Sequence, residues 1–217
     1  MVCNHLIGAA ARAALSMGFC AIAATATAAP VPTAPAPALS PGFKVEWVQV
    51  TTSPHSIADA LNALNGTGGF TVVDTHTEFR STVGIDDATV PFAGADQFAV
   101  RVSGYIDLAA GDYRFGGIHD DGLRLTIGGE QVITFDSDTA PTLTTSALFT
   151  LAAGVYAFEA ISWEQGGIFE LDLGTMNAAG GLVLIEGFHA AQAVPEPGSF
   201  ALAGLALLGL GLSRRRR

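Results

Sequence analysis

Residues 104–133, GYIDLAAGDYRFGGIHDDGLRLTIGGEQVI, decide the fold of this 217-residue chain. Apolar and polar residues alternate within short runs, and Ala-Gly, Asp-Asp-Gly and Gly-Gly separate the runs. Alternation with a period of two is typical of strands that bury one face. Gly128-Gly129 lies between two such runs and predicts a two-residue hairpin turn. The stretch therefore predicts successive antiparallel strands joined by tight turns.

The flanking sequence repeats this pattern, with one exception. Ser56–Leu64 has helical spacing, follows Ser53-Pro54 and ends at a Gly-rich run, so it predicts the chain's one helix. Short strands without intervening helices are typical of an antiparallel sandwich or barrel. The predicted strands are Phe43–Val50, Phe70–Val73, Glu78–Thr82, Gln97–Leu108, Gly111–Ile118, Leu123–Ile127, Gln131–Phe135, Ala147–Leu151, Gly154–Trp163 and Ile168–Leu173.

The N-terminus, residues 1–28, has the composition of a secretory signal peptide. Arg12 precedes an apolar stretch, and Ala26-Thr27-Ala28 offers the small residues that signal peptidase cleaves after. Both cysteines, Cys3 and Cys20, lie inside this segment, so the mature protein would contain no thiol. Lipid attachment at Cys20 is a weaker alternative, because the usual Leu three residues earlier is missing.

The C-terminus has three consecutive parts: Pro195-Glu196-Pro197, an uncharged apolar run over 199–212, and Arg214–Arg217. This tail, residues 194–217, resembles the PEP-CTERM sorting signal of Gram-negative bacteria. The resemblance implies export, transient anchoring in the inner membrane, processing by an exosortase, and a final place at the cell surface or in the exopolysaccharide matrix. Fourteen apolar residues are short for a membrane span, which usually needs about 20, and a buried C-terminal helix is the alternative.

Residues 29–42 are rich in Pro and Ala and are expected to form an extended linker that holds the domain off its neighbours. Between residues 30 and 193, five basic residues stand against nineteen acidic ones, a net charge of −14. Such a domain repels nucleic acid and anionic lipid and attracts divalent cations, so nucleic acid is excluded as a partner.

The order strand, Ala-Gly turn, aromatic strand, Asp-Asp-Gly, apolar strand and Gly turn in residues 104–133 resembles the centre of the PA14 domain. LAAGVY at 151–156, SWEQGG at 162–167 and Phe169-Glu170-Leu171 match the strands that follow in that family. The resemblance covers about residues 43–174, is strongest from Gly104 onward, and implies an all-β, antiparallel β-sandwich. We place this domain at residues 43–190.

The resemblance also implies a site at Asp120 and Asp121. In sugar-binding PA14 lectins the matching pair is joined by a cis peptide and holds Ca²⁺, which accepts sugar hydroxyls directly. Carried over, Asp120 and Asp121 are the metal ligands, and Gly122 would relieve the backbone beside them. Asp-Asp-Gly is also an ordinary tight-turn sequence, and that alternative stays open.

Further residues complete the predicted ligand-binding set. The acidic loop Asp136-Ser137-Asp138 could approach the pair or could simply be solvated. Trp163 could stack on a sugar ring, although aromatic residues in strands are more often core. Asp74, His76 and Glu78 share one face of a strand and could bind a metal or face solvent. The full ligand-binding set is His119, Gly122, Asp136, Asp138, Trp163 and Glu164.

No motif of a serine hydrolase, zinc protease or phosphate-binding loop is present, so we expect no catalysis. The sequence predicts an exported protein of the surface or exopolysaccharide matrix that binds carbohydrate, with Ca²⁺ as the cofactor. The alternatives are a structural matrix or envelope protein without a small ligand and a small glycan-active hydrolase.

Overall fold

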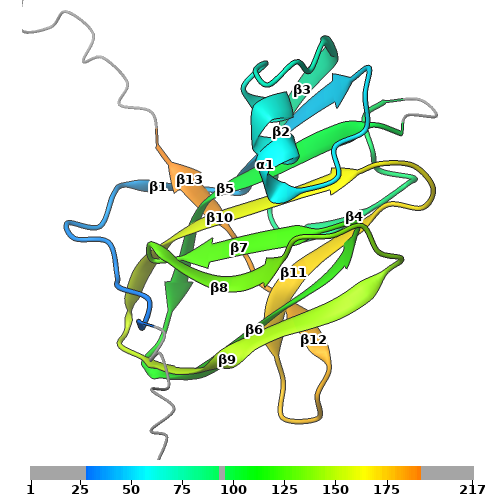
Figure 1. The fold of residues 1–217 in the computed structure, drawn as a ribbon. Coiled ribbons are helices and arrows are strands. Elements are labelled where there is room, and N and C mark those ends of the chain that lie inside the picture. The colour runs from blue at the N-terminus through cyan, green and yellow to red at the C-terminus, as the bar shows by residue number, and fades with distance from the viewer. Residues whose placement is uncertain (1–27, 93–95, 192–217) are drawn as a thin grey trace, which may run out of the picture.

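The structure is a computed structural model and describes residues 28–92 and 96–191. It confirms the predicted antiparallel β-sandwich (Figure 1). The elements are β1 Leu39–Pro41, β2 Phe43–Val50, α1 Ile57–Leu64, β3 Val72–Arg80, β4 Val83–Asp86, β5 Phe98–Leu108, β6 Gly111–Asp120, β7 Leu123–Ile127, β8 Glu130–Phe135, β9 Thr142–Leu151, β10 Gly154–Glu164, β11 Glu170–Met176, β12 Leu182–Leu184 and β13 Phe188–Ala190.

The larger sheet centres on β5 and β10, which pair along eleven residues from Gly154↔Leu108 to Glu164↔Phe98. β7 and β8 extend it beyond β10. The opposite edge of β5 pairs with β2, and β2 pairs with β3. Beyond the end of β2, the same edge of β5 pairs with β13. β1 pairs with β13 and completes this sheet.

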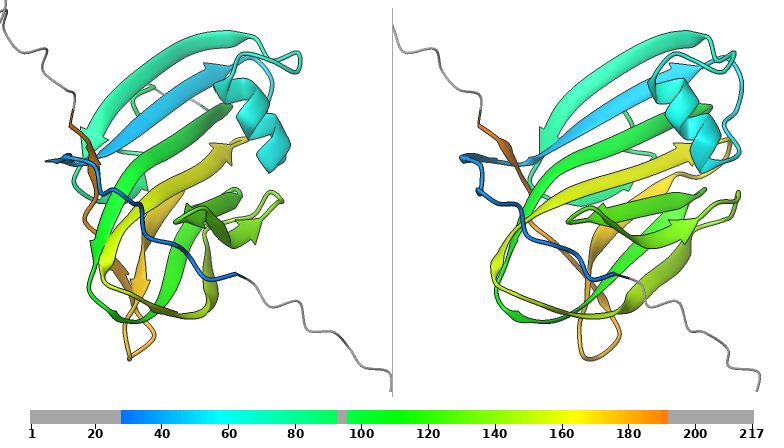
Figure 2. Two further views of the ribbon diagram at one scale, coloured as in Figure 1. Left: turned by 90° about the vertical axis from the view of Figure 1, so that its left-hand side faces the viewer. Right: turned by 60° about the vertical axis from the view of Figure 1, so that its left-hand side comes forward.

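The smaller sheet has the order β12-β11-β6-β9, with β4 also pairing with β11. β4 and β12 share one edge of β11, since they pair with different halves of that strand. The two sheets face each other as the layers of a sandwich (Figure 2).

The alternation seen in the sequence explains the core. In β7, Leu123, Leu125 and Ile127 are buried, whereas Arg124 and Thr126 between them are only partly buried. The same alternation in β2 and β5 sends one row of large side chains from each strand between the sheets. Trp47, Phe98 and Phe169 pack edge to face in this core.

The one helix of the described residues, α1, lies on the outer face of the larger sheet, over β2, β5 and β10 (Figures 1 and 2). Ser56, the first residue of the predicted helix, is its N-cap and accepts the Asp59 N–H at 3.1 Å. Ile57, Ala60 and Ala63 are buried against a second apolar cluster that includes Ile161 and Trp163. α1 thus covers one end of a sheet face that would otherwise be solvated.

The N-terminal segment departs from the expected linker. Pro30 is buried, the Val31 N–H donates to the Gly128 carbonyl, and the Thr33 N–H donates to the Val155 carbonyl at 2.7 Å. Residues 39–41 then form β1. The expectation of a free spacer is therefore wrong for these residues, because the backbone N–H groups between the prolines find carbonyl partners on the sandwich.

Other differences concern strands. β3 is one continuous strand where two were predicted, and β4, β12 and β13 were not predicted. Within the two described ranges, no helix is both long and apolar enough to cross a membrane. The predicted signal peptide before residue 28, the sorting residues Pro195, Glu196 and Pro197 and the apolar run 199–212 lie outside the described residues.

Candidate functional site

The Asp120–Asp121 pair joins β6 to β7 at one end of the sandwich. The peptide bond between the two residues is cis, which the resemblance implied and the sequence alone left open. The Asp121 N–H donates to the Trp163 carbonyl at 2.8 Å. Its carboxylate accepts the Thr139 N–H at 3.1 Å and the Gln165 N–H at 2.8 Å. Three loops, β6–β7, β8–β9 and β10–β11, therefore meet at this side chain.

Glu164 brings a third carboxylate to the pair. Ligand oxygens of Asp120, Asp121 and Glu164 lie within 4.8 Å of one another, and all three residues are buried. Glu164 Oε1 accepts the Gly166 N–H at 2.6 Å. Glu164 Oε2 is buried and has no hydrogen-bond partner among the described residues. A buried carboxylate oxygen without a partner is costly, so this oxygen points to a missing positive group.

The proton affinities of these carboxyl groups reflect their crowding. Burial, followed by repulsion from Asp121, raises the pKa of Asp120 to about 7. Burial and the same neighbour raise the pKa of Glu164 to about 8. Burial also raises the pKa of Asp121, although its two backbone donors oppose this. Without a cation, the cluster therefore retains protons near neutral pH.

The residues present fit a hard divalent cation. Ca²⁺ prefers six to eight oxygen ligands, and carboxylates are its usual protein ligands. Asp120, Asp121 and Glu164 would supply three carboxylates, and the unpartnered Glu164 Oε2 would gain a partner. Sulfur or nitrogen ligands, which zinc favours, are absent from this group.

His119 is fully buried next to the pair and supports it from behind. Its Nδ1–H donates to the Asp121 carbonyl at 2.7 Å, which leaves Nε2 to accept the Thr144 hydroxyl at 2.8 Å. Burial lowers the pKa of His119, so the ring is held neutral. His119 was predicted to bind the ligand. Because it is fully buried and contacts the Asp121 backbone, it would affect a ligand only by holding the turn in place.

Trp163 and Gly122 form a second support. The Trp163 side chain is fully buried beneath α1, which favours the core interpretation over stacking on a sugar. A Cβ at Gly122 would overlap the Trp163 ring. Gly122 is not among the glycines with positive φ, so the expected role in relieving the backbone is wrong. The glycine is required because the indole ring occupies the space of a side chain.

Of the two aspartates in the predicted acidic loop, Asp138 lines the site and Asp136 does not. Asp138 Oδ1 accepts the Trp163 Nε1–H at 3.0 Å, and Oδ2 lies 2.6 Å from His55 Nδ1. Asp136 turns away, because its carboxylate accepts the Ile57 N–H at the start of α1. Asp138 thus lines the site, and Asp136 anchors the helix instead.

A concavity of about 460 Å³ opens above the cluster. It is lined by Asp120, Asp121, Asp138, residues 139–141 and residues 165, 166 and 168. Ile168 is 63% exposed at this rim and offers an apolar surface beside the carboxylates. Carboxylates at the floor and an apolar residue at the wall would suit a ligand with both polar and C–H faces.

The other predicted metal arrangement does not form. Among the described residues, the cluster at Asp120 is the one group of three or more His, Cys, Asp or Glu side chains close enough to share an ion. Glu78 instead accepts from Trp47 Nε1 and from Arg80 Nε, and Asp74 and His76 are exposed. The solvent-facing interpretation of this strand is therefore favoured.

Sequence reasoning placed Glu164 near a ligand but did not assign it to the metal. Its signal was a charged residue directly after Ile161-Ser162-Trp163, at the end of a predicted strand. The backbone donors at Thr139 and Gln165 left no signal in residue type, since any non-proline residue carries an N–H.

Comparison with known proteins supports the fold and the sorting motif. Residues 193–217 match the model of the PEP-CTERM protein-sorting motif. Curated protein sequences give no match to the chain. A solved structure of the PA14 domain of the MpAFP antifreeze protein is similar, with a TM-score of 0.57 and 21% identity over 70% of this chain and 93% of that one.

Two further structures share the fold. A PA14 sugar-binding domain from an RTX adhesin has a TM-score of 0.53 and 18% identity, over 69% of this chain and 98% of that one. A subtype-switched epithelial adhesin 9 A domain from Candida glabrata, solved with β-lactose, has a TM-score of 0.50 and 11% identity, over 78% and 98% of the two chains. The chain therefore carries a PEP-CTERM protein-sorting motif at residues 193–217, and its described residues form a PA14-like β-sandwich.

Proposed function

We propose that this protein is an exported component of a bacterial cell surface or exopolysaccharide matrix, and that its sandwich binds carbohydrate through Ca²⁺ held by Asp120, Asp121 and Glu164. The observation that carries the proposal is the buried trio of carboxylates with an unpartnered oxygen below an open concavity. The sorting motif implies export and surface localisation. The proposal includes Gram-negative origin, transient inner-membrane anchoring and processing by an exosortase.

The division of labour follows from the contacts. Asp120, Asp121 and Glu164 would hold the ion, and a bound Ca²⁺ would supply open coordination positions for neighbouring hydroxyls of a sugar. His119, Trp163 and Gly122 keep the turn in place. Asp138, Gln165 and Ile168 line the wall that the rest of the sugar would contact. We propose that this arrangement binds its ligand and does not cleave it.

Thermal unfolding of the purified protein at pH 8, in EDTA and in Ca²⁺, tests the metal. Ca²⁺ at about 100 times its Kd should add about 2.7 kcal/mol, or roughly 5–10 °C in Tm for a domain of this size. Asp121→Asn and Glu164→Gln should lose this shift, because each removes a charged ligand. Glu130→Gln, in the β7–β8 hairpin, is the matched control and should keep it.

A glycan array probed with the same proteins tests the ligand. We expect binding in Ca²⁺ that disappears in EDTA and in Asp121→Asn. A Ca²⁺ shift without glycan binding would reduce the site to a structural ion and favour a matrix role. The absence of any Ca²⁺ shift in a well-folded parent would refute the proposed site.

A further inference from the structure

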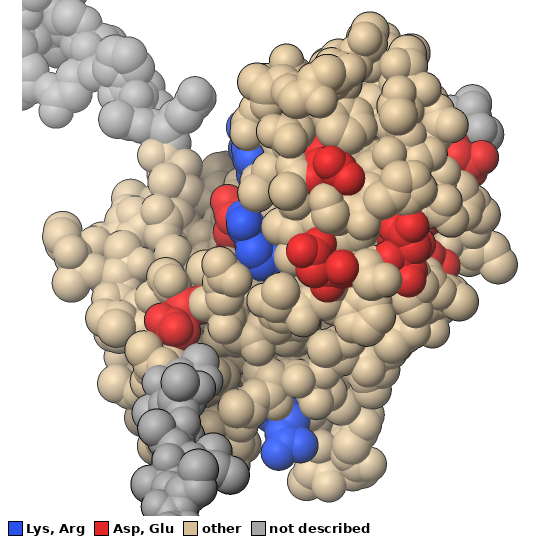
Figure 3. All heavy atoms as spheres, in the orientation of Figure 1, with Lys and Arg blue, Asp and Glu red and all other residues tan. Residues whose placement is uncertain are grey.

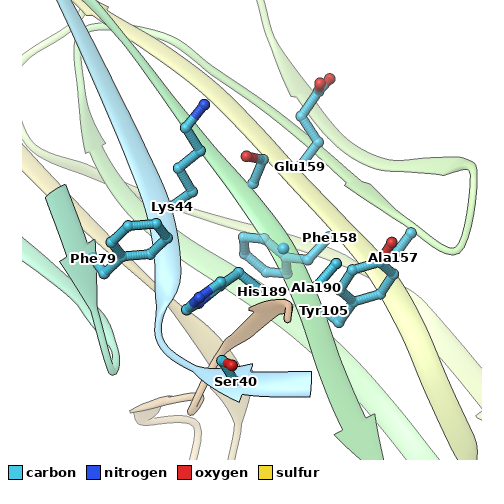
Figure 4. A pocket seen from close by; sticks show the side chains of 11 residues that line it. Ser40, Lys44, Phe79, Tyr105, Ala157, Phe158, Glu159, His189 and Ala190 are labelled. Carbon is cyan, nitrogen blue, oxygen red and sulfur yellow. The ribbon is translucent and has the colours of Figure 1, made fainter. Parts of the chain in front are cut away.

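A second, larger concavity lies on the outer face of the larger sheet, away from the carboxylate cluster. It measures about 860 Å³ and lies where β1 and β13 cross the ends of β2, β5 and β10 (Figure 4). We call it the outer groove and define it by Lys44, Phe79, Ser103, Tyr105, Glu159 and His189. Its volume falls in the range of small-molecule sites, about 300–1,000 Å³.

Strand register explains why these side chains meet. Phe79 pairs with Lys44, Lys44 with Ser103, and Ser103 with Glu159, so four strands contribute one continuous row. Lys44, Ser103 and Glu159 have core residues beside them on β2, β5 and β10, so the row itself must face outward. Tyr105 and Ala157 form the next row, which β13 borders through the pairing of Phe188 with Tyr105.

One wall of the outer groove is aromatic. Phe79 is 56% exposed, and its ring centroid lies 4.3 Å from that of His189 (Figure 4). The His189 Nδ1–H donates to the Gly42 carbonyl at 2.9 Å, which fixes the ring against the sheet. A held, exposed aromatic face beside hydroxyl and charged groups matches the alternating C–H and O–H surfaces of a sugar ring.

The groove is also the basic part of an acidic domain. Lys44 lines it, and the adjacent row contributes Arg101 and Arg124, so three of the five basic residues between positions 30 and 193 share this face. The two carboxylates on these rows, Glu46 and Glu159, do not neutralise all three. On the view in Figure 3, basic atoms lie next to acidic ones left of centre, whereas elsewhere acidic atoms predominate.

The basic side chains are not fully engaged. Arg124 pairs with Glu159 at 2.8 Å, while Arg101 reaches the same carboxylate only at 4.0 Å. The Nε atoms of both arginines are buried without a hydrogen-bond partner among the described residues. Lys44 contacts Glu46 at 2.6 Å and remains 41% exposed, so its ammonium group is accessible. A ligand carboxylate could therefore approach the ammonium group of Lys44 here, whereas carboxylates line the concavity at Asp120.

We propose that the outer groove binds an acidic saccharide, a uronate unit of a polysaccharide, without a metal ion. Lys44 pairs with the uronate carboxylate, Phe79 and Tyr105 contact the ring, and Ser103 and Glu159 take its hydroxyls. This site is independent of the carboxylate cluster. Glu159 and Glu164 are five residues apart on β10, about 17 Å along the strand.

The test is calorimetric titration of the purified protein, in EDTA, with tetragalacturonate and with the same tetrasaccharide after complete methyl esterification. The acid form should bind, and the neutral ester should bind at least about tenfold more weakly because it lacks the charge that Lys44 pairs with. Phe79→Ala and Lys44→Met should each weaken binding of the acid by a similar factor, while Lys44→Arg should retain most of it.

The controls separate the groove from the rest of the molecule. Leu148→Ala removes an equally exposed apolar side chain on β9, and Asp121→Asn disables the carboxylate cluster, so both should bind tetragalacturonate as the parent does. Each variant must first show a Tm close to the parent's. Equal binding of acid and ester, no effect of Lys44→Met, loss of binding in Asp121→Asn, or no binding of the acid at all would each overturn the proposal.

Discussion

At the scale of single residues, the candidate site depends on close contact between Gly122 and Trp163. The indole ring fills the position of a side chain at residue 122 and donates its N–H to Asp138, and the Trp163 carbonyl accepts the Asp121 N–H. One buried aromatic residue therefore connects the two loops that carry the acidic groups. Its position in turn depends on a neighbour without a side chain.

We predict that Gly122→Ala destabilises the protein by about 1–3 kcal/mol, the usual cost of overpacking a filled core. It should also weaken Ca²⁺ binding, because displacement of the indole moves the turn at Asp121. Urea unfolding and calcium titration measure the two effects.

Gly111→Ala is the matched control for this substitution. Residue 111 lacks a positive φ, and its Cβ would meet only Tyr113 at 3.7 Å, an ordinary contact. Equal stability of Gly122→Ala and Gly111→Ala would show that the ring does not constrain residue 122.

The sequence carried part of this site. Asp120 and Asp121 were predicted through the resemblance of residues 104–133 to the PA14 domain. The third carboxylate was not assigned to the metal, because Glu164 lies 43 positions further on and only the pairing of β10 with β7 brings it near. The role of Gly122 was misjudged, since a sequence does not show which side chain lies opposite a glycine.

At the scale of elements, β1 and the residues before it act as a strap on the sandwich. Three residue pairs join β1 to β13, and the Ala191 N–H donates to the Ala38 carbonyl at 2.8 Å. Ser40 on this strand also lines the outer groove. The strap thus closes one edge of the larger sheet and borders a proposed binding site.

Deletion of residues 28–41 should lower the free energy of unfolding by about 2 kcal/mol, or roughly 5 °C in Tm. Several backbone hydrogen bonds of about 0.5–1.5 kcal/mol each are lost, and the chain freedom regained offsets part of this. Calorimetry of the shortened and complete proteins measures the change. Ala36→Ser, at an exposed position of the strap, should leave Tm unaltered, and an unaltered Tm after the deletion would show that the strap adds nothing.

The long elements were predictable and the short ones were not. β5, β7 and β10 alternate over five to eleven residues, and α1 carries a cap and a breaker, so local sequence specifies them. β1, β12 and β13 have three residues each, too few for a period to appear. β3 is a polar edge strand, and its continuity comes from pairing with β2.

At the scale of the whole molecule, the buried carboxyl groups make stability depend on pH. The pKa values of Asp120 and Glu164 rise to about 7 and about 8 in the folded state from 3.8 and 4.5. Between about pH 4 and pH 8 the folded protein therefore binds more protons than the unfolded chain, and these groups lower stability as pH rises. Above about pH 8 and below about pH 4 they add no further slope.

We predict that in EDTA the Tm of the parent falls between pH 5 and pH 8 by more than that of Glu164→Gln, which lacks one of these groups. Saturating Ca²⁺ should remove the difference in slope, because the ion stabilises the charged carboxylates. Scanning calorimetry across this range provides the comparison. If Tm of the parent and of the variant changed equally with pH in EDTA, the pKa of Glu164 would not be raised. Burial and repulsion within the cluster would then not destabilise its charged form.

The short strand β13 has a mechanical consequence. If the protein is held at its C-terminus while a ligand is bound at the far loops, tension would enter the sandwich through β13, the last element of the described residues. Three residue pairs with β1 and one with β5 hold it, whereas the ligand end is carried on β10, which pairs over eleven residues. The pairing of β13 is thus the weakest interaction between the C-terminal end of the domain and the proposed binding site. Under such tension β13 would separate from the sheet first and lengthen the C-terminal connection. The loops at the end of β10, which form the proposed binding site, would stay folded.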